Sequence, residues 1–117
     1  ENARHLGRDI IGPELEKLKA KHPSVGDVRG VGVFWAIELV KNRETREPLV
    51  PFNAAGPAAA PMAELIGACK AQGLWPFTHF NRMHVVPPLT TSDEDVRAGI
   101  AIIDDVLTLA DAHYTGN

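Results

Sequence analysis

The sequence predicts a small α+β domain, in which helices cover one face of a three- to four-stranded, mainly antiparallel sheet. Apolar residues recur at three- and four-residue spacing near both ends of the chain, a pattern typical of amphipathic helices. The last two predicted strands are joined by Asn81-Arg82, a link too short for a crossover, so at least this pair must be antiparallel. The predicted order is helix, two strands, helix, two strands, helix.

The first helix is expected over residues 1–21. Its predicted apolar face consists of Leu6, Ile10, Ile11, Leu15 and Leu18. Gly12-Pro13 interrupts this pattern, and we expect a kink or two short helices, because proline lacks an amide hydrogen and crowds the preceding turn. His22 precedes a proline, where the α region is disfavoured, so the helix should end there.

Residues 27–40 predict two short strands, or one bent strand broken at residues 30–32. Both faces of residues 33–40 are largely apolar, so this strand is expected to be central in the sheet. The Gly-Val-Gly step at 30–32 lacks the third glycine and following helix of a dinucleotide site. We interpret it as a bend or a close backbone approach. Residues 41–51 are polar and contain Pro48, which predicts an exposed turn.

The middle of the chain predicts a helix followed by a strand pair. Residues 52–61 are rich in alanine, glycine and proline and are expected to be irregular. A helix should cover residues 58–72 and end at Gly73 in a left-handed cap, with Cys69 in the core. Strands are expected at 74–80 and 83–86, and Pro76 places the first of them at an edge or delays its start.

The last helix is expected to run to about His113. Thr91 with Glu94, or Ser92 with Asp95, supplies a capping pair at its start. Its predicted buried stripe is Val96, Ile100, Ile103, Leu107 and Ala110.

Composition limits the classes of partner. A net charge of −3 without a cluster of basic residues argues against nucleic acid. We expect no membrane span, because no apolar run approaches the required length of roughly 18 residues. The single cysteine excludes an internal disulfide and fits a reducing cytosol, so a cytoplasmic location is expected.

Three polar features of the predicted strands are candidates for chemistry. Glu38 lies in an apolar strand and could be a catalytic acid, although an ion pair with Arg29 or a lysine is favoured. His79 and His84 could face one metal ion, but metal sites need three or four ligands, so ordinary strand histidines are favoured. Arg82, beside aromatic residues, could clamp a carboxylate. The favoured alternative is an ordinary turn arginine that is exposed to solvent. The remaining histidines, at positions 5, 22 and 113, are isolated and suggest nothing.

Several segments, in order and at matching spacing, resemble the C-terminal region of class III (ornithine/ω-amino-acid type) aminotransferases. They are residues 2–7, 22–30, 32–41, 81–89 and 90–95. The resemblance implies a fold-type I, pyridoxal-phosphate-dependent homodimer. Such an enzyme moves an amino group from an amine or amino acid donor to a 2-oxo acid. It also implies that residues 1–117 are the small domain, with the large cofactor-binding domain absent from the chain.

The same resemblance indicates where a substrate would bind. Many members carry an arginine three residues before a Pro-Pro pair, where it binds the substrate α-carboxylate. His84 occupies that position here, and Arg82, on the same face of an extended strand, could replace it. With Asn81 these are the expected substrate-binding residues, and the departure favours an amine, an ω-amino acid or a sulfonate donor.

We nominate no catalytic, cofactor-binding or metal-binding residue in this chain. The aldimine-forming lysine of the family would precede Glu1, and its sequence context surrounds none of Lys17, Lys19, Lys21, Lys41 and Lys70. The chain is therefore expected to be a fragment that is inactive and does not bind pyridoxal phosphate. Uncovered apolar surface should make it self-associate. The alternative is a stand-alone α+β module that binds a small ligand or another protein.

Overall fold

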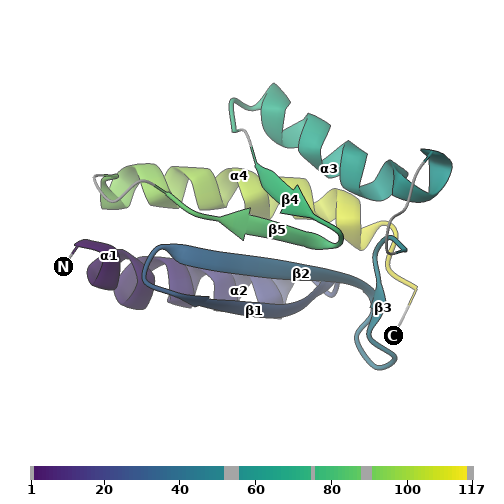
Figure 1. Ribbon diagram of the computed structural model, residues 1–117, viewed down its shortest axis with the longest axis horizontal. Helices are drawn as coiled ribbons and strands as arrows, with labels where there is room; N and C mark the ends of the chain where they lie inside the picture. The colour runs from purple at the N-terminus through teal and green to yellow at the C-terminus, as the bar shows by residue number, and fades with distance from the viewer. Residues whose placement is uncertain (1, 52–55, 75, 88–90, 116–117) are drawn as a thin grey trace.

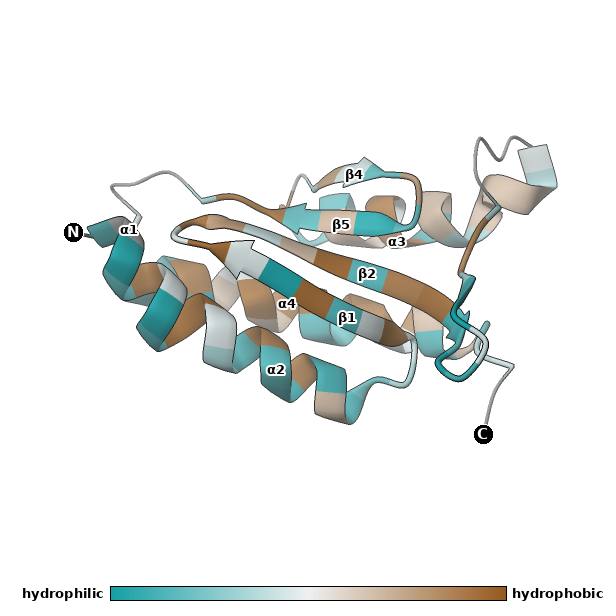
Figure 2. Ribbon diagram, turned by 60° about the horizontal axis from the view of Figure 1, so that its bottom comes forward, coloured by the Kyte–Doolittle hydropathy of each residue, from teal (hydrophilic) through white to brown (hydrophobic). Residues whose placement is uncertain are grey.

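The computed structural model describes residues 2–51, 56–74, 76–87 and 91–115, and these form a helical layer and a sheet layer (Figure 1 and Figure 2). Five strands pair antiparallel in the order β1-β2-β5-β4, with β3 beside β2. The strands are β1 (Val25–Val31), β2 (Phe34–Asn42), β3 (Glu47–Pro48), β4 (Phe77–His79) and β5 (Arg82–Val85). In Figure 1, α2 (Gly12–Lys21) and α4 (Asp93–Asp111) lie behind the sheet, α3 (Ala60–Ala71) lies above β4, and the front face of the sheet is uncovered. The predicted α+β class is confirmed, with the two-residue β3 as an additional strand.

The N-terminal segment is a continuous helical rod rather than two separate helices. It comprises α1 (Asn2–His5), the π-helical η1 (Leu6–Ile11) and α2 (Gly12–Lys21). The Gly12 amide donates to the carbonyl of Gly7, five residues back. This wider turn accommodates Pro13, which has no amide hydrogen to donate. The predicted disturbance at Gly12-Pro13 is therefore a π-helical stretch just before the proline.

Residues 25–42 form a hairpin, the first of the two predicted alternatives. Its turn lies at Gly32-Val33, and β1 begins two residues earlier than expected. The predicted close backbone approach occurs at Gly30, where an added β-carbon would lie 2.3 Å from a ring carbon of Trp35. The Trp35 indole also donates to the Gly32 carbonyl at 2.7 Å. The absence of a side chain at Gly30 thus makes room for the indole beside the turn.

Strand β2 is central, as predicted, because it pairs with β1, β3 and β5. The polar turn is shorter than expected, since β2 continues to Asn42 and the buried Leu49 and Val50 belong to the core. The Leu49 amide donates to the Leu39 carbonyl at 3.1 Å, which brings the chain back along the edge of β2. The prediction that residues 41–51 are an exposed turn is thus wrong for both ends of that range.

Helix α3 (Ala60–Ala71) follows the short 3-10 helix η2 (Gly56–Ala59), so the helical start expected at 58 moves by two residues. Residues 52–55 of the segment expected to be irregular lie outside the described residues. Cys69 is buried in the core, as predicted. Gly73 has φ +89°, its amide donates to Lys70, and that of Leu74 donates to Cys69. These bonds form the expected left-handed cap.

Strand β4 begins only at Phe77 and lies at the sheet edge, in line with the prediction from Pro76. Trp75, within the predicted strand, lies outside the described residues. The turn consists of Phe80-Asn81, one residue earlier than expected, so Arg82 opens β5 instead of lying at the hairpin tip. Phe80 has φ 59°, which is uncommon for a bulky residue.

Helix α4 (Asp93–Asp111) ends two residues before the predicted His113. Ser92 is its N-cap, and its hydroxyl accepts a hydrogen bond from the Asp95 amide at 3.1 Å. The Ser92–Asp95 alternative is thus the one adopted. The predicted stripe is buried in full: Val96, Ile100, Ile103, Leu107 and Ala110.

Replacing Ser92 with alanine should lower the free energy of unfolding by about 1 kcal/mol, because the first helical turn loses its side-chain acceptor. Urea denaturation followed by circular dichroism measures the change. Ser92→Asp is the control, since aspartate caps a helix equally well. An aspartate variant as unstable as the alanine variant would contradict the capping role.

Candidate functional site

The uncovered face of the sheet brings the predicted polar residues together. Arg82 and His84 flank the buried Met83 in β5, so both side chains lie on the face opposite the helices. In the strand register Arg82 lies beside Glu38, and His84 lies between Ala36 and Phe77. This face, which we call the open face, is the candidate functional site.

Two aromatic rings flank His84 on the open face, which also carries exposed aliphatic side chains. The ring centroid of His84 lies 6.1 Å from that of Phe34 and 5.1 Å from that of Phe77. These two phenylalanines are 60% and 68% exposed, and Val31 and Val86 are 79% and 53% exposed. Exposed apolar groups that gather on one face mark a site for a ligand or another protein surface.

The open face combines a permanent cation with an imidazole that resists protonation. The pKa of His84 lies below its ordinary value, first because of burial and then because of the neighbouring positive charge of Arg82. The exposed His79 also lowers the pKa of His84. A neutral imidazole has one nitrogen that donates and one that accepts a hydrogen bond.

Two polar atoms at this site have no hydrogen-bond partner within the described part of the chain. They are Nε of Arg82 and Nδ1 of His84, and both atoms are buried. Buried polar groups in proteins normally have a partner. A bound molecule or a further protein segment on the open face would supply the missing partners once these side chains turn outward.

Asn81 has a structural role in the turn before β5. Its side-chain amide donates to the Leu39 carbonyl at 2.7 Å, and the Leu39 amide donates to the Asn81 carbonyl at 2.8 Å. The side chain is buried, with 3% of its surface exposed. The proposal that Asn81 contacts a substrate stays a prediction.

Glu38 is paired, as the sequence favoured. Its carboxylate oxygens lie 3.7 Å from Nη2 of Arg29 and 3.5 Å from Nη2 of Arg46, so the second partner is an arginine rather than a lysine. For His79 and His84, the described residues contain no cluster of three or more potential metal ligands. A metal at this histidine pair would thus need ligands from elsewhere.

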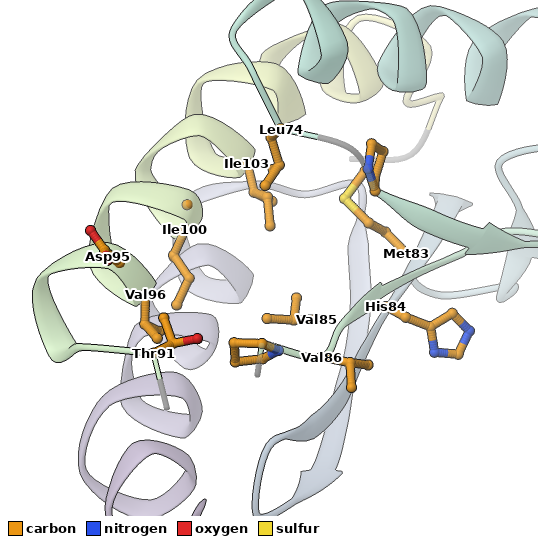
Figure 3. A pocket seen from close by; sticks show the side chains of 13 residues that line it. Leu74, Met83, His84, Val85, Val86, Thr91, Asp95, Val96, Ile100 and Ile103 are labelled. Atoms are coloured by element: carbon orange, nitrogen blue, oxygen red, sulfur yellow. The ribbon is translucent and has the colours of Figure 1, made fainter. Parts of the chain in front are cut away.

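Behind β5 lies an apolar cavity of about 280 Å³, which separates this strand from α4. Figure 3 shows Val85 facing the side chains of α4 across the cavity. Its apolar lining includes Leu74, Met83, Val85, Val96, Ile100 and Ile103. The strand that carries Arg82 and His84 therefore lies between this cavity and the open face.

The most connected polar cluster is centred on His22, which the sequence pattern did not single out. This imidazole is 1% exposed and lies 2.5 Å from Asp111 Oδ2 through Nδ1 and 2.6 Å from Asp104 Oδ1 through Nε2. Ser24 also donates to Asp111, at 2.7 Å. The cluster joins the end of α2 to α4 on the helical side, so it supports the fold rather than the open face.

Comparison with known proteins assigns the chain to a family. Residues 1–107 match the family described as Aminotransferase class-III. The chain belongs to the class-III aminotransferase family. The resemblance found in the sequence is thereby confirmed.

Individual relatives of this member of the class-III family are longer proteins. It is 36% identical over 117 residues to taurine–pyruvate aminotransferase of Bilophila wadsworthia, covering 97% of this chain and 25% of that protein. It is 35% identical over 112 residues to ethanolamine-phosphate phospho-lyase homolog 1 of Caenorhabditis elegans, covering 93% of this chain and 22% of that one. The chain thus spans about a quarter of the length of the curated relatives it matches.

A solved structure shares the fold. Taurine:2-oxoglutarate aminotransferase from Bifidobacterium kashiwanohense, in complex with PLP and glutamate, superposes with a TM-score of 0.83 at 29% identity. The match covers 95% of this chain and 24% of that one. Helices in the described segments are too short or too polar to span a membrane.

The residues of this chain do not fit the attachment of the family's cofactor. An aldimine-forming lysine must reach into an enclosed site, whereas the lysines here are exposed or half-buried. Three of them, Lys17, Lys19 and Lys21, lie within salt-bridge distance of surface carboxylates. We therefore assign no step of cofactor chemistry to this chain.

Proposed function

We propose that residues 1–117 form the small domain of a longer pyridoxal-phosphate-dependent transaminase. This enzyme would move an amino group from an amine or amino acid to a 2-oxo acid. Family membership and the coverage of about a quarter of each relative support this proposal. The parent enzyme is further proposed to be a cytoplasmic homodimer. The chain alone would be inactive, because the cofactor and its lysine would belong to the remainder of the protein.

The observation that carries the role of the open face is its pair of unpartnered buried atoms, Arg82 Nε and His84 Nδ1. We propose that the open face forms one wall of the substrate site. Arg82 would bind an acidic group of the donor through its planar, permanently charged guanidinium. His84, between Phe34 and Phe77, would contact the carbon chain of the donor.

The charge of this wall limits the donors that it would accept. A neutral imidazole at position 84 cannot replace an arginine as the clamp for an α-carboxylate. Donors whose acidic group is absent, or lies farther from the amine, avoid this loss. We therefore propose an amine, an ω-amino acid or a sulfonate as the donor. Taurine, an amino sulfonate, occurs in the names of two of the related proteins and supports this choice.

Donor kinetics of the longer enzyme test the role of Arg82. Arg82→Ala should lower kcat/KM for acidic donors by about tenfold to a hundredfold, because a hydrogen bond to a charged group contributes about 1.5–3 kcal/mol. An uncharged primary amine should be little affected. Arg97→Ala, at an exposed position on α4, is the matched control. Equal losses for charged and uncharged donors would remove Arg82 from the substrate site.

The complementary variant is His84→Arg, which restores the arginine of many family members. It should raise kcat/KM for an α-amino acid donor relative to an ω-amino acid. One relative is named as a phospho-lyase, so elimination of phosphate is a second candidate reaction. Parallel assays for released phosphate and for amino-group transfer distinguish the two. Binding of pyridoxal phosphate as an aldimine by the 117-residue chain alone would overturn the assignment to a small domain.

A further inference from the structure

Arg82 has a carboxylate as its cross-strand neighbour, yet the two groups are not paired. Glu38 lies directly opposite Arg82 in the register of β2 and β5, so both side chains leave the same face of the sheet. The β-carbons of such a pair lie roughly 4.5–5.5 Å apart, and opposite charges there normally attract each other. Within the described residues, however, no carboxylate lies within salt-bridge distance of Arg82. The Glu38 carboxylate must therefore be held elsewhere.

Two arginines from outside β5 hold the carboxylate of Glu38. Nη2 of Arg29, on β1, lies 3.7 Å from its Oε1 atom. Nη2 of Arg46, in the turn between β2 and β3, lies 3.5 Å from its Oε2 atom. The Glu38 side chain is 23% exposed, so salt screens these contacts less than it would at a fully exposed site. One guanidinium thus faces each carboxylate oxygen, and neither is that of Arg82.

Arg46 is the more specific of the two partners. Glu38 is its only ion-pair partner in the described part of the chain, whereas Arg29 also lies 3.7 Å from Asp27. Arg46 adopts φ 65°, in the left-handed region that glycine and asparagine tolerate best. An arginine in this turn therefore carries a backbone cost that glycine would avoid. What its side chain contributes there is the contact with Glu38.

A Glu38 carboxylate turned toward Arg82 would compete with an acidic donor. The guanidinium of Arg82 is a planar fork, and a carboxylate that fills it leaves no second fork for the donor. Because Glu38 belongs to the same chain, its effective concentration beside Arg82 would be roughly millimolar or higher. Its negative charge would also repel an approaching anion. The ion pairs with Arg29 and Arg46 therefore leave the charge of Arg82 uncompensated.

We propose that Glu38 is an internal competitor for Arg82, and that Arg29 and Arg46 are positioning residues that hold it away. The ligand class favoured by this arrangement is a donor with a carboxylate or sulfonate group, bound on the open face. This inference rests on the proposed function, because it takes Arg82 as the residue that binds that acidic group. It adds residues that set the affinity for acidic donors without touching them.

Donor kinetics of the longer enzyme test this role with Arg46→Asn. Asparagine tolerates the left-handed conformation and keeps the turn, while the guanidinium is removed. KM for taurine or an ω-amino acid should rise about fivefold, the upper range for a partly exposed ion pair, with kcat unchanged. KM for an uncharged primary amine should change far less. Arg8→Gln, which removes an arginine 3.6 Å from Asp9, is the matched control.

A second substitution, Glu38→Gln, separates holding of the competitor from direct attraction of the donor. If Arg46 acts by holding Glu38, its loss has no effect once the carboxylate is gone. The double variant Glu38→Gln/Arg46→Asn should therefore have the same KM for acidic donors as Glu38→Gln alone. A fivefold rise that persists in the Glu38→Gln background would mean that Arg46 attracts the donor itself, and would overturn the proposal. An unchanged KM in Arg46→Asn would overturn it as well.

NMR of the Arg82 Nε–H group in the 117-residue chain gives a readout that needs no enzyme activity. Arg46→Asn should shift this resonance as Glu38 closes on Arg82, and should not shift it when Glu38 is replaced by glutamine. Unchanged circular dichroism shows that the variants are folded. A resonance that ignores Arg46→Asn would refute the inference. If the resonance shifts but Arg82→Ala affects acidic and uncharged donors alike, the proposed substrate role of Arg82 fails instead.

Discussion

His22→Ala is expected to lower the free energy of unfolding by about 3–5 kcal/mol. The imidazole contacts a carboxylate oxygen of Asp104 at 2.6 Å and one of Asp111 at 2.5 Å. Each hydrogen bond to a charged group contributes about 1.5–3 kcal/mol. The side chain is 1% exposed, so water cannot take its place without rearrangement of the interface between α2 and α4.

Neighbouring groups would compensate for only part of this loss. Ser24 keeps its bond to Asp111, and Lys21 keeps its contact with Asp104 at 3.0 Å. Each carboxylate still loses its shortest contact within the described residues. His113→Ala is the matched control, because His113 is half-exposed and lies 3.4 Å from Glu64. Urea denaturation should place this control within about 0.5 kcal/mol of wild type. Equal losses for the two variants would refute the bridging role of His22.

Acid titration of stability provides a second readout of the same cluster. The hydrogen bond from His22, and then those from Lys21, hold the pKa of Asp104 below its ordinary value of 3.8. The folded protein therefore releases this proton more readily than the unfolded chain does. The resulting stabilisation is complete at neutral pH and is lost as the pH falls from about 3.8 through the lower folded-state pKa. His22→Ala should make this acid loss shallower, as urea midpoints across the acidic range would record.

Elements with local determinants were predictable from the sequence. Helix α4 has its cap and its apolar stripe within one stretch of chain, and both were found where expected. The Gly73 cap depends on one glycine two residues after the end of α3. The position of Arg82 and His84 on one face follows from the alternation of an extended strand. In each case the physical cause lies within a few residues.

Features that depend on distant residues were not predictable in this way. The two carboxylates that contact His22, those of Asp104 and Asp111, lie 82 and 89 residues farther along the chain. The turn before β5 was placed one residue late, because it uses Phe80 at positive φ, a conformation that usually favours glycine or asparagine. Hydrogen bonds between Asn81 and Leu39, on a separate strand, hold that turn.

The candidate site likewise combines features set by one strand with features that depend on distant strands. That Arg82 and His84 share a face is a property of one strand, whereas the rings beside His84 come from two others. Phe34 reaches His84 because β2 pairs with β5, a contact that no local pattern specifies. The exposed aromatic surroundings and the lowered pKa of His84 therefore required the tertiary structure.

Gly7→Ala is expected to lower the free energy of unfolding by about 3 kcal/mol, the upper end of the range for overpacked cores. Gly7 lies in η1, directly beneath the turn of the β1–β2 hairpin. A β-carbon at this position would lie 2.1 Å from the Gly32 carbonyl oxygen. That oxygen is backbone and also accepts the Trp35 indole hydrogen at 2.7 Å, so it cannot move away without breaking this bond.

Gly67→Ala is the matched control, because it makes the same change in a helix with open space around it. Gly67 lies in α3, and nothing stands within 4 Å of an added β-carbon. Alanine should stabilise this position by about 0.5–1 kcal/mol through helix propensity. The two substitutions are thus expected to have opposite signs, as measured by urea denaturation followed by circular dichroism. Stabilisation by both would mean that the hairpin turn can lift off the helix, and that the approach of Gly32 to Gly7 does not constrain the fold.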